Sequence, residues 1–317
     1  MRQDRPPSSG ERWSSHTDQT LRHQLRKVGE QTRQILPALL RELGTTKDAE
    51  TSFKYTLRRH TRLDPQHCPY FPQPATIQVI NDDTINAAIN LGAQNPAHDS
   101  TTGQQHNWTP MILNHAAENT PGGGWLNGAL AQEESLCYRS SLAMSLDHRH
   151  YPLADGAVYS PYVLVIRDDL ASGHRLFDTA QPRSLPVLAT ASAAALRDPA
   201  VRTFRVPVTV SGEQAHGGEA RWKHVFKRDS ERSSTKDKMR LVLRMAAYNR
   251  HRRLVLGALG CGVYANPPED VAHCWLEVLR EDEFAGNWWH DVCFAVYDPK
   301  NLGNFEVFYR VMHGKKV

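Results

Sequence analysis

Hydrophobic residues recur at helical spacing near the start of the chain and then give way to charge and proline. From residue 17 to residue 43 they lie three or four positions apart, which predicts one long helix that Pro37 bends or divides and Gly44 ends. Residues 45–75 mix charged residues with four prolines. This second pattern indicates an irregular segment that wraps around the rest of the protein.

After residue 75, short apolar runs alternate with helix-like segments. The apolar runs predict strands at residues 75–80, 110–116, 162–169, 184–192, 253–260 and 291–298. The segments between them predict helices at residues 81–93, 131–146, 233–249 and 268–280. Strands that alternate with helices indicate an α/β fold in which helices sandwich a sheet.

The same pattern divides the chain into parts. We expect a disordered tail at residues 1–16, a helical extension at residues 17–74 and an α/β domain at residues 75–317. Residues 211–237 are polar and rich in glycine, lysine and arginine. Their composition predicts a long mobile insertion within the domain.

Composition and charge narrow the class of protein. The 317 residues are 40% hydrophobic and 23% charged with a net charge of +4, which is typical of a globular protein and compatible with a polyanionic ligand. Five dispersed cysteines indicate reduced thiols and no zinc site. With neither an apolar signal segment nor a membrane-length apolar run, we expect a cytoplasmic protein, or a nuclear one in a eukaryote.

Two glycine-rich junctions follow predicted strands and precede predicted helices. One reads ENTPGGGWLNGALAQEES (residues 118–135) and the other LGALGCGVYANPPEDVA (residues 256–272). Ligands of α/β sheets bind at this edge, where glycines let backbone N–H groups face an anion such as a phosphate. Two such junctions indicate a ligand with a diphosphate or two sugars. The alternative is that both are only tight turns between a strand and a helix.

Glu133 and Glu134 lie in the first turn of the helix predicted after the glycine run. The helix dipole stabilises acidic residues there, so either glutamate alone has an ordinary structural explanation. An adjacent pair is less expected, because each ionised carboxylate penalises the other and a bound ligand removes water, which raises the pKa of one member. Such a pair suits general acid catalysis near neutral pH and fits the cleavage of a glycosidic bond.

The spacing GGG-x7-QEE, within NTPGGG and QEESLCYRSSL, resembles the signature of the poly(ADP-ribose) glycohydrolases, most closely of their microbial type. The second junction resembles the diphosphate loop that these enzymes share with macrodomains, and INDDTINAAINLGA and SLPVLATAS resemble further segments of the family. The likeness covers roughly residues 21–302 and leaves residues 211–237 unmatched. It implies a macrodomain-like three-layer α/β/α sandwich with an N-terminal helical extension.

The resemblance also implies a role for each matching residue. Glu134 would protonate the leaving ribose oxygen and then activate water, Glu133 would bind the ribose hydroxyls, and Gln132 would support both. Tyr264 would press against the distal ribose, at a position where microbial members carry phenylalanine. The full set of expected substrate-binding residues is Asn119, Gly122, Gly123, Gly124, Gln132, Gly260, Cys261, Gly262, Val263 and Tyr264.

The activity that the resemblance implies is hydrolysis of ribose–ribose bonds in poly(ADP-ribose) from chain ends, with ADP-ribose as the product. It requires no metal or other cofactor. It implies poly(ADP-ribose) or an ADP-ribosylated protein as the partner, and neither a membrane nor a specific nucleic acid. Two alternatives stay open: hydrolysis of mono-ADP-ribosylated protein or another ADP-ribose conjugate, and a non-catalytic ADP-ribose-binding macrodomain. The intact glutamate pair favours an enzyme.

Other polar residues give weaker functional signals. Basic and aromatic residues interleave in RWKHVFKRDSER (residues 221–232), which is a candidate surface for the phosphates of a polymer, although a solvated basic loop explains the pattern more simply. His115, His148 and His150 are candidate metal ligands with ordinary structural explanations. Cys261 is a candidate reactive thiol, for which packing is the simpler explanation.

Overall fold

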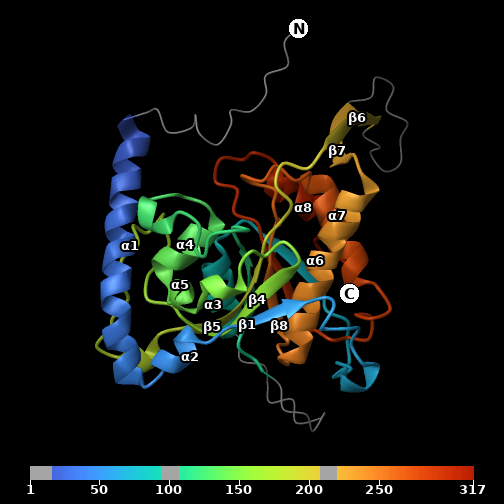
Figure 1. Cartoon of the computed structure of the whole chain (residues 1–317). Coiled ribbons are helices and arrows are strands. Elements are labelled where there is room, and N and C mark those ends of the chain that lie inside the picture. Colours follow the sequence, from blue (N-terminus) through green and yellow to red (C-terminus); the bar gives the residue numbers. More distant parts are fainter. Residues whose placement is uncertain (1–15, 94–106, 208–219) are drawn as a thin grey trace.

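The computed structural model describes residues 16–93, 107–207 and 220–317, and within them a seven-stranded sheet forms the centre of the protein (Figure 1). The strand order is β1-β4-β5-β3-β8-β9-β2. The strand bounds, in that order, are Phe53–Thr56, Gly156–Leu164, Val187–Ala193, Met111–His115, Arg253–Leu256, Asp291–Ala295 and Ile77–Ile80. The strands from β5 to β2 pair in parallel, whereas β4 pairs antiparallel with both β5 and β1.

Helices cover both faces of this sheet. On one face lie α1 (His16–Leu43), α3 (Thr84–Ala93) and α4 (Gln132–Arg139), and on the other α6 (Asp229–Tyr248), α7 (Pro268–Leu279) and α8 (Asn304–Met312). Successive strand residues point to opposite faces. Accordingly Ile112 and Val255 pack against the face that α1, α3 and α4 cover. Their neighbours Leu113 and Leu254 pack against the face that α6, α7 and α8 cover. The expected α/β/α sandwich is therefore confirmed.

Helix α1 is docked on the layer that contains α4. The hydroxyl of Thr32, which is fully buried, donates to the carbonyl oxygen of Tyr138 (2.7 Å) and accepts from Nε of Arg167 (2.9 Å). Gly29 lets the Trp125 ring pack closely, since a Cβ there would lie 3.3 Å from the ring. Through these contacts α1 supports the segment that joins the glycine run to α4.

Pro37 lies inside α1 without dividing it, so the helix runs unbroken to Leu43. Gly44 adopts a φ of +71°, a left-handed conformation that ends the helix as predicted. No helix in the described part of the chain is long and apolar enough to cross a membrane.

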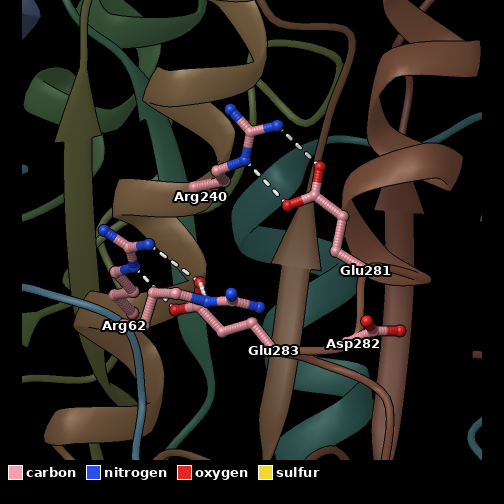
Figure 2. Close-up of a pocket in the computed structure, with 6 residues that line it drawn as sticks. Arg62, Arg240, Glu281, Asp282 and Glu283 are labelled. Atoms are coloured by element: carbon pink, nitrogen blue, oxygen red, sulfur yellow. Dashed lines mark hydrogen bonds and ion pairs between the residues drawn. The ribbon is translucent and has the colours of Figure 1, made fainter.

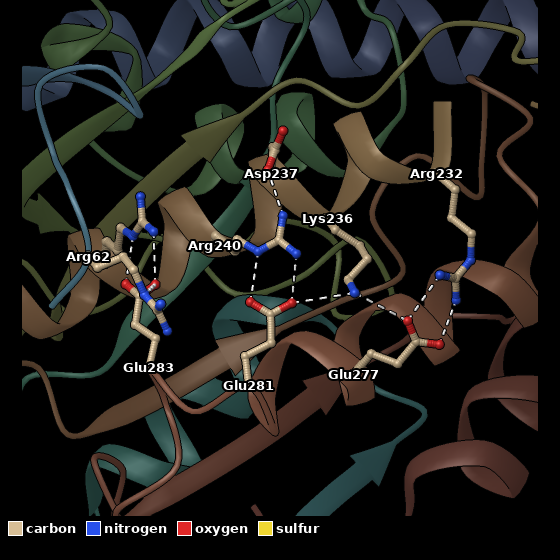
Figure 3. A network of polar contacts seen from close by, with 9 residues as sticks. Arg62, Arg232, Lys236, Asp237, Arg240, Glu277, Glu281 and Glu283 are labelled. Carbon is tan, nitrogen blue, oxygen red and sulfur yellow. Dashed lines mark hydrogen bonds and ion pairs between the residues drawn. The ribbon is translucent and has the colours of Figure 1, made fainter. Parts of the chain in front are cut away.

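A row of ion pairs joins α6 to α7 and to the turn after α7 (Figure 3). With N···O distances between 2.6 and 3.4 Å, the pairs are Arg232–Glu277, Lys236–Glu277, Lys236–Glu281, Arg240–Glu281 and Arg244–Glu283. The Arg244–Glu283 pair is buried, with side chains 9% and 3% exposed. The row joins α7 to α6, and α7 begins directly after the second glycine junction.

The helix predicted at residues 131–146 is wrong as one element. The chain forms α4, then an extended Ser140, then the short helix α5 (Leu142–Ser145). The backbone N–H of Ser141 donates to the carbonyl of Leu164 at the end of β4, and the hydroxyl of Ser141 accepts from the N–H of Leu164. Pairing with a neighbouring strand thus interrupts a segment whose apolar spacing suits a continuous helix.

The strand predicted at residues 162–169 is also misplaced, because β4 runs from Gly156 to Leu164. The register of its pairing with β5 shifts between Ser160 and Val163. Pro161 lies at this irregularity, where a residue without an N–H group is tolerated. Because proline is unusual inside a strand, the sequence pattern did not predict the part of β4 that precedes Pro161.

Several element boundaries and one segment differ from expectation. The predicted strands at residues 253–260 and 291–298 end earlier, at Leu256 and Ala295. The segment 45–75, expected to be irregular, contains α2 (Thr46–Glu50) and β1, and α8 was not predicted. The domain division at residue 75 stays a prediction, although β1 joins the same sheet as the later strands.

The insertion predicted at residues 211–237 is wrong for its second half. Residues 220–226 form β7 (Ala220–Phe226), which pairs antiparallel with β6 (Val201–Pro207) in a separate two-stranded ribbon. Helix α6 then begins at Asp229, earlier than residue 233. Residues 208–219, and residues 1–15 of the predicted tail, lie outside the described residues.

We predict that Thr32→Val lowers the free energy of unfolding by about 1–3 kcal/mol. The variant keeps the side-chain shape but leaves the buried carbonyl of Tyr138 and Nε of Arg167 each without this partner. Denaturant unfolding measures the change. Thr51→Val is the matched control, because its hydroxyl bonds only an exposed carbonyl of its own helix; an equal loss in both variants would contradict the anchoring role of Thr32.

Candidate active site

The two glycine junctions meet at one edge of the sheet. The first follows β3 and the second follows β8, and these two strands are parallel neighbours. The carboxyl ends of parallel strands lie at the same edge, which is where α/β proteins bind ligands. The sheet therefore brings the two glycine junctions to the same edge.

Glu133 is buried in the first turn of α4, with 2% of its surface exposed. Its Oε1 accepts from Nδ2 of Asn114 (3.2 Å), and its Oε2 accepts from the backbone N–H of Ala117 (2.7 Å). Burial, with a smaller contribution from the nearby charge of Glu134, raises the pKa of Glu133 to about 7 against the opposing effect of these hydrogen bonds. Both carboxylate oxygens of Glu133 are thus fixed in place.

Glu134 faces the glycine run directly. Its Oε1 accepts from the backbone N–H of Gly124 at 2.9 Å. Gly123 adopts a φ of +56°, and a Cβ built on it would lie 2.4 Å from Oε1 of Glu134. At this position only glycine leaves room for the carboxylate. Glu134 is also the more open member of the pair, 9% exposed against 2% for Glu133.

Gln132 connects α4 to the end of β3. Its Oε1 accepts from the N–H of His115 (2.8 Å), and its Nε2 donates to the carbonyl of Leu113 (2.7 Å) and to the hydroxyl of Thr84 (3.2 Å). The amide therefore bonds the backbone on both sides of Asn114. It positions the start of α4, and its role in substrate binding stays a prediction.

The second junction is a compact turn organised by Asn266. Nδ2 of Asn266 lies within hydrogen-bond distance of the carbonyls of Leu196 (2.6 Å), Gly260 (3.2 Å) and Tyr264 (3.1 Å). Gly260 has a φ of +76°, and a Cβ there would lie 2.5 Å from the Asn266 side chain. The turn is thus preformed by one buried amide and one glycine.

Tyr264 links the two junctions. Its hydroxyl accepts a long hydrogen bond, 3.4 Å, from the backbone N–H of Glu118, just before the glycine run. The guanidinium of Arg197 lies over its ring, 5.1 Å from the centroid. A tyrosine therefore makes a contact here that a phenylalanine, which lacks the hydroxyl, could not make.

The other expected substrate-binding residues differ in their surroundings. Asn119 is exposed, Val263 is half-exposed, and a Cβ on Gly262 would meet open space. Cys261 is buried, and burial raises the pKa of its thiol well above the usual range, so the thiol is not reactive in this state. Gly122 has a φ of +70° and packs against Trp125.

Sequence reasoning missed Asn114 and Asn266, which hold the two junctions in place. Asn114 is fully buried at the end of β3 and donates to both Glu133 and Ser192. An asparagine within the apolar run MILNHA was the available signal, since a buried amide requires hydrogen-bond partners. Asn266 had a weaker signal, because only its neighbouring prolines marked the turn.

The three histidines considered as candidate metal ligands, His115, His148 and His150, do not form a metal-binding cluster. Burial lowers the pKa of His115 to about 4, so its ring is neutral, and its Nε2 would lie 2.9 Å from a Cβ on Gly257. His148 and His150 lie in a single turn after α5. Within the three described ranges, no group of three histidine, cysteine or acidic side chains is placed to bind a metal ion.

A surface pocket of about 470 Å³ lies away from the glycine junctions (Figure 2). Its lining residues are Arg62, Arg240, Arg244, Glu281, Asp282 and Glu283. The pocket adjoins the C-terminal end of α7, whereas the second junction precedes its N-terminal end, about 18 Å away along twelve helical residues. Its arginines pair with its own glutamates, so it has no excess of either charge for a phosphate ligand.

Comparison with known proteins gives a consistent set of relatives. The family model for the microbial-type PARG catalytic domain matches residues 12–168. The chain is similar to the structure of poly(ADP-ribose) glycohydrolase (PARG) from Thermomonospora curvata, with 25% identity, a TM-score of 0.65, and coverage of 91% of this chain and 99% of that chain. No curated protein matches the chain.

Two ligand-bound structures are also similar. The Thermomonospora curvata enzyme bound to the inhibitor ADP-HPD has 25% identity, a TM-score of 0.64 and coverage of 91% of this chain and 99% of that chain. PARG from Deinococcus radiodurans in complex with ADP-ribose has 27% identity, a TM-score of 0.59 and coverage of 82% and 93%.

We predict that Glu133 makes the folded protein less stable as the pH rises from about 4.5 to 7. Over this window the unfolded chain loses the proton of Glu133 while the folded protein retains it, because the folded pKa is raised from 4.5 to about 7. The loss should reach about 1–3 kcal/mol and then stay constant at higher pH. Unfolding of the wild type and of Glu133→Gln between pH 4 and 8 measures it; parallel pH profiles would contradict the raised pKa.

Proposed function

This chain belongs to the microbial-type poly(ADP-ribose) glycohydrolase family, and we propose that it hydrolyses the ribose–ribose O-glycosidic bonds of poly(ADP-ribose) from chain ends, releasing ADP-ribose. One observation carries the proposal. The adjacent carboxylates of Glu133 and Glu134 are buried against the backbone of a glycine run, in a sheet that adds a second glycine junction alongside. A protein that only binds ADP-ribose has no need for this pair.

Glu134 is the general acid and base in this proposal. It gives its proton to the leaving ribose oxygen as the C–O bond breaks, and a water molecule adds to the anomeric carbon while returning a proton to Glu134. The exposure of Glu134, greater than that of Glu133, and the hydrogen bond from Gly124 to one of its oxygens support this role. The sequence of steps requires no metal and no covalent intermediate.

Glu133 orients the sugar rather than cleaving the bond. Both of its oxygens are held by Asn114 and Ala117, and its raised pKa leaves it partly protonated near neutral pH. A carboxyl in this state can donate to one ribose hydroxyl and accept from another. A pair in which protons are retained does not hold two full negative charges, which limits repulsion between its carboxylates.

The two glycine junctions bind the rest of the terminal ADP-ribose unit. The turn at residues 260–264 offers backbone N–H groups to the diphosphate, and the ring of Tyr264 supports the distal ribose. Asn119 and the run Gly122–Gly124 lie on the other side of that ribose. Helix α1 packs on the loop after the glycine run and supports it from outside.

We place the enzyme in a reducing compartment, the cytoplasm. All five cysteines are buried and unpaired. Proteins of oxidising compartments usually pair such residues. The substrate in this proposal is also an intracellular polymer or a protein that carries it.

We predict that Glu134→Gln lowers the release of ADP-ribose from poly(ADP-ribosyl)ated protein by about 10²- to 10⁴-fold, because the amide cannot transfer a proton. Its affinity for free ADP-ribose should stay close to that of the wild type. Glu42→Gln, an exposed glutamate of α1, is the matched control and should keep full activity. Glu133→Gln should weaken ribose binding as well as turnover.

Other outcomes would redirect the assignment. The wild type could bind ADP-ribose and leave the polymer intact but release ADP-ribose from mono-ADP-ribosylated protein. This result would identify a hydrolase of mono-ADP-ribosylated protein. Binding with no hydrolysis of either substrate would identify a reader. If Glu133→Gln abolished turnover while Glu134→Gln kept it, the two roles would be exchanged.

We predict that Gly123→Ala abolishes turnover as fully as Glu134→Gln does. The added Cβ would lie 2.4 Å from Oε1 of Glu134 and would push the carboxylate out of position. Gly173→Ala is the matched control, because Gly173 also has a positive φ, +83°, but no atom lies within 4 Å of its Cβ position. Comparable losses of turnover in the two variants would show that backbone strain alone causes the effect.

A further inference from the structure

The ribbon of β6 and β7 projects from the body of the protein beside α7 (Figure 1). Its strands read VRTFRVP and ARWKHVF and contain no acidic residue. With seven residues in each strand, it extends for about 20 Å. Strand β7 packs against α7 at its C-terminal end, where Phe226 is buried, but residues 201–205 and Trp222 are exposed and available to a partner.

Each face of the ribbon combines cations with an aromatic ring. On one face Arg205 lies opposite Trp222, and its guanidinium is 5.7 Å from the ring centroid. On the other face Phe204 lies opposite Lys223, and Arg202 lies 6.0 Å from the Phe204 ring centroid. Trp222 is 60% exposed and Phe204 is 38% exposed.

The cations of the ribbon whose side chains the structure describes are Arg202, Arg205 and Lys223. Among the described residues, no carboxylate forms an ion pair with Arg202, Arg205 or Lys223. This contrasts with the face formed by α6 and α7, where every arginine of the row has an acidic partner. A cluster of cations with exposed aromatic rings is complementary to a chain of phosphates and bases.

The base of the ribbon is attached to the second glycine junction. Just before β6, the N–H of Asp198 donates to the carbonyl of Tyr264, and Arg197 covers the Tyr264 ring. At the end of β7, the N–H of Phe226 donates to Asp270 in the first turn of α7 (3.0 Å). The ribbon therefore starts at the side of the site where we place the diphosphate and the distal ribose.

We propose that the β6–β7 ribbon binds the units of poly(ADP-ribose) beyond the one in the active site, its arginines and lysine contacting phosphates and its aromatic rings stacking on adenines. The inference rests on the proposed function. Its partner is an extended polyanion with bases, because cations and aromatic rings recur along about 20 Å of the ribbon. The ribbon thus favours long polymer over a single unit.

Binding of long poly(ADP-ribose), measured in the Glu134→Gln background, tests the ribbon. The triple variant Arg202→Gln, Arg205→Gln and Lys223→Gln should raise the Kd for polymer roughly tenfold. It should also reduce the slope of log Kd against log salt by about 2, since each phosphate contact contributes ~0.7 to the slope. Trp222→Ser should raise the Kd about 5- to 100-fold. Affinity for free ADP-ribose and the melting temperature should not change in either variant.

A matched triple variant controls for net charge. Lys47→Gln, Arg58→Gln and Arg59→Gln remove three exposed cations near α2 and β1, at the opposite end of the protein from the ribbon (Figure 1), and should leave polymer binding unchanged. Equal losses in the two triple variants would overturn the inference, as would unchanged polymer binding in the ribbon variants.

Two further measurements separate the inference from its premises. If the ribbon variants weakened binding of single-stranded poly(A) as much as or more than that of poly(ADP-ribose), the ribbon would be a nucleic-acid surface and the inference would fail. Turnover of polymer by the wild type is measured in parallel. Its absence would remove the proposed function, whereas normal turnover with unaffected ribbon variants would remove only the ribbon's role.

Discussion

The close approach of the glycine backbone to the two carboxylates is the constraint on which this protein depends. Gly123 lies so near Glu134 that no other residue fits, and Gly124 donates a hydrogen bond to the same carboxylate oxygen. The cost of burying two acids is offset by hydrogen bonds from Ala117 and Asn114 and by the raised pKa of Glu133. The chemistry of the site therefore follows from backbone conformation as much as from the acids.

The surrounding elements serve to keep that approach in place. Gln132 bonds the end of β3, so α4 cannot move along the sheet without breaking three hydrogen bonds. Helix α1 supports the same region from outside through Thr32 and through the packing of Gly29 on Trp125. On the far face of the sheet, the ion pairs between α6 and α7 fix the helix that follows the second junction (Figure 3).

The two parts of the proposed substrate surface differ in character. The site at the sheet edge is rigid, because glycines with positive φ and buried amides define it. The β6–β7 ribbon is exposed and cationic, and the segment just before it bonds Tyr264, the residue that also bridges the two junctions. A rigid site with an adjoining polyanion-binding ribbon suits an enzyme that must select the end of a long polymer and hold the remainder.

The sequence alone determined the alternation of strands and helices, the location of both glycine junctions and the acidic first turn of α4. These features depend on local spacing and on residue types with strong conformational preferences. Only the tertiary structure decided where α4 ends, because the hydrogen bonds between Ser141 and Leu164 join residues that are distant in sequence. The same holds for the pairing of β6 with β7, since β7 lies in the segment that local composition suggested to be a mobile insertion. It holds also for Asn114, whose role arises when β3 and α4 come together. Contacts of this kind are absent from local patterns, since they form only after the sheet is assembled.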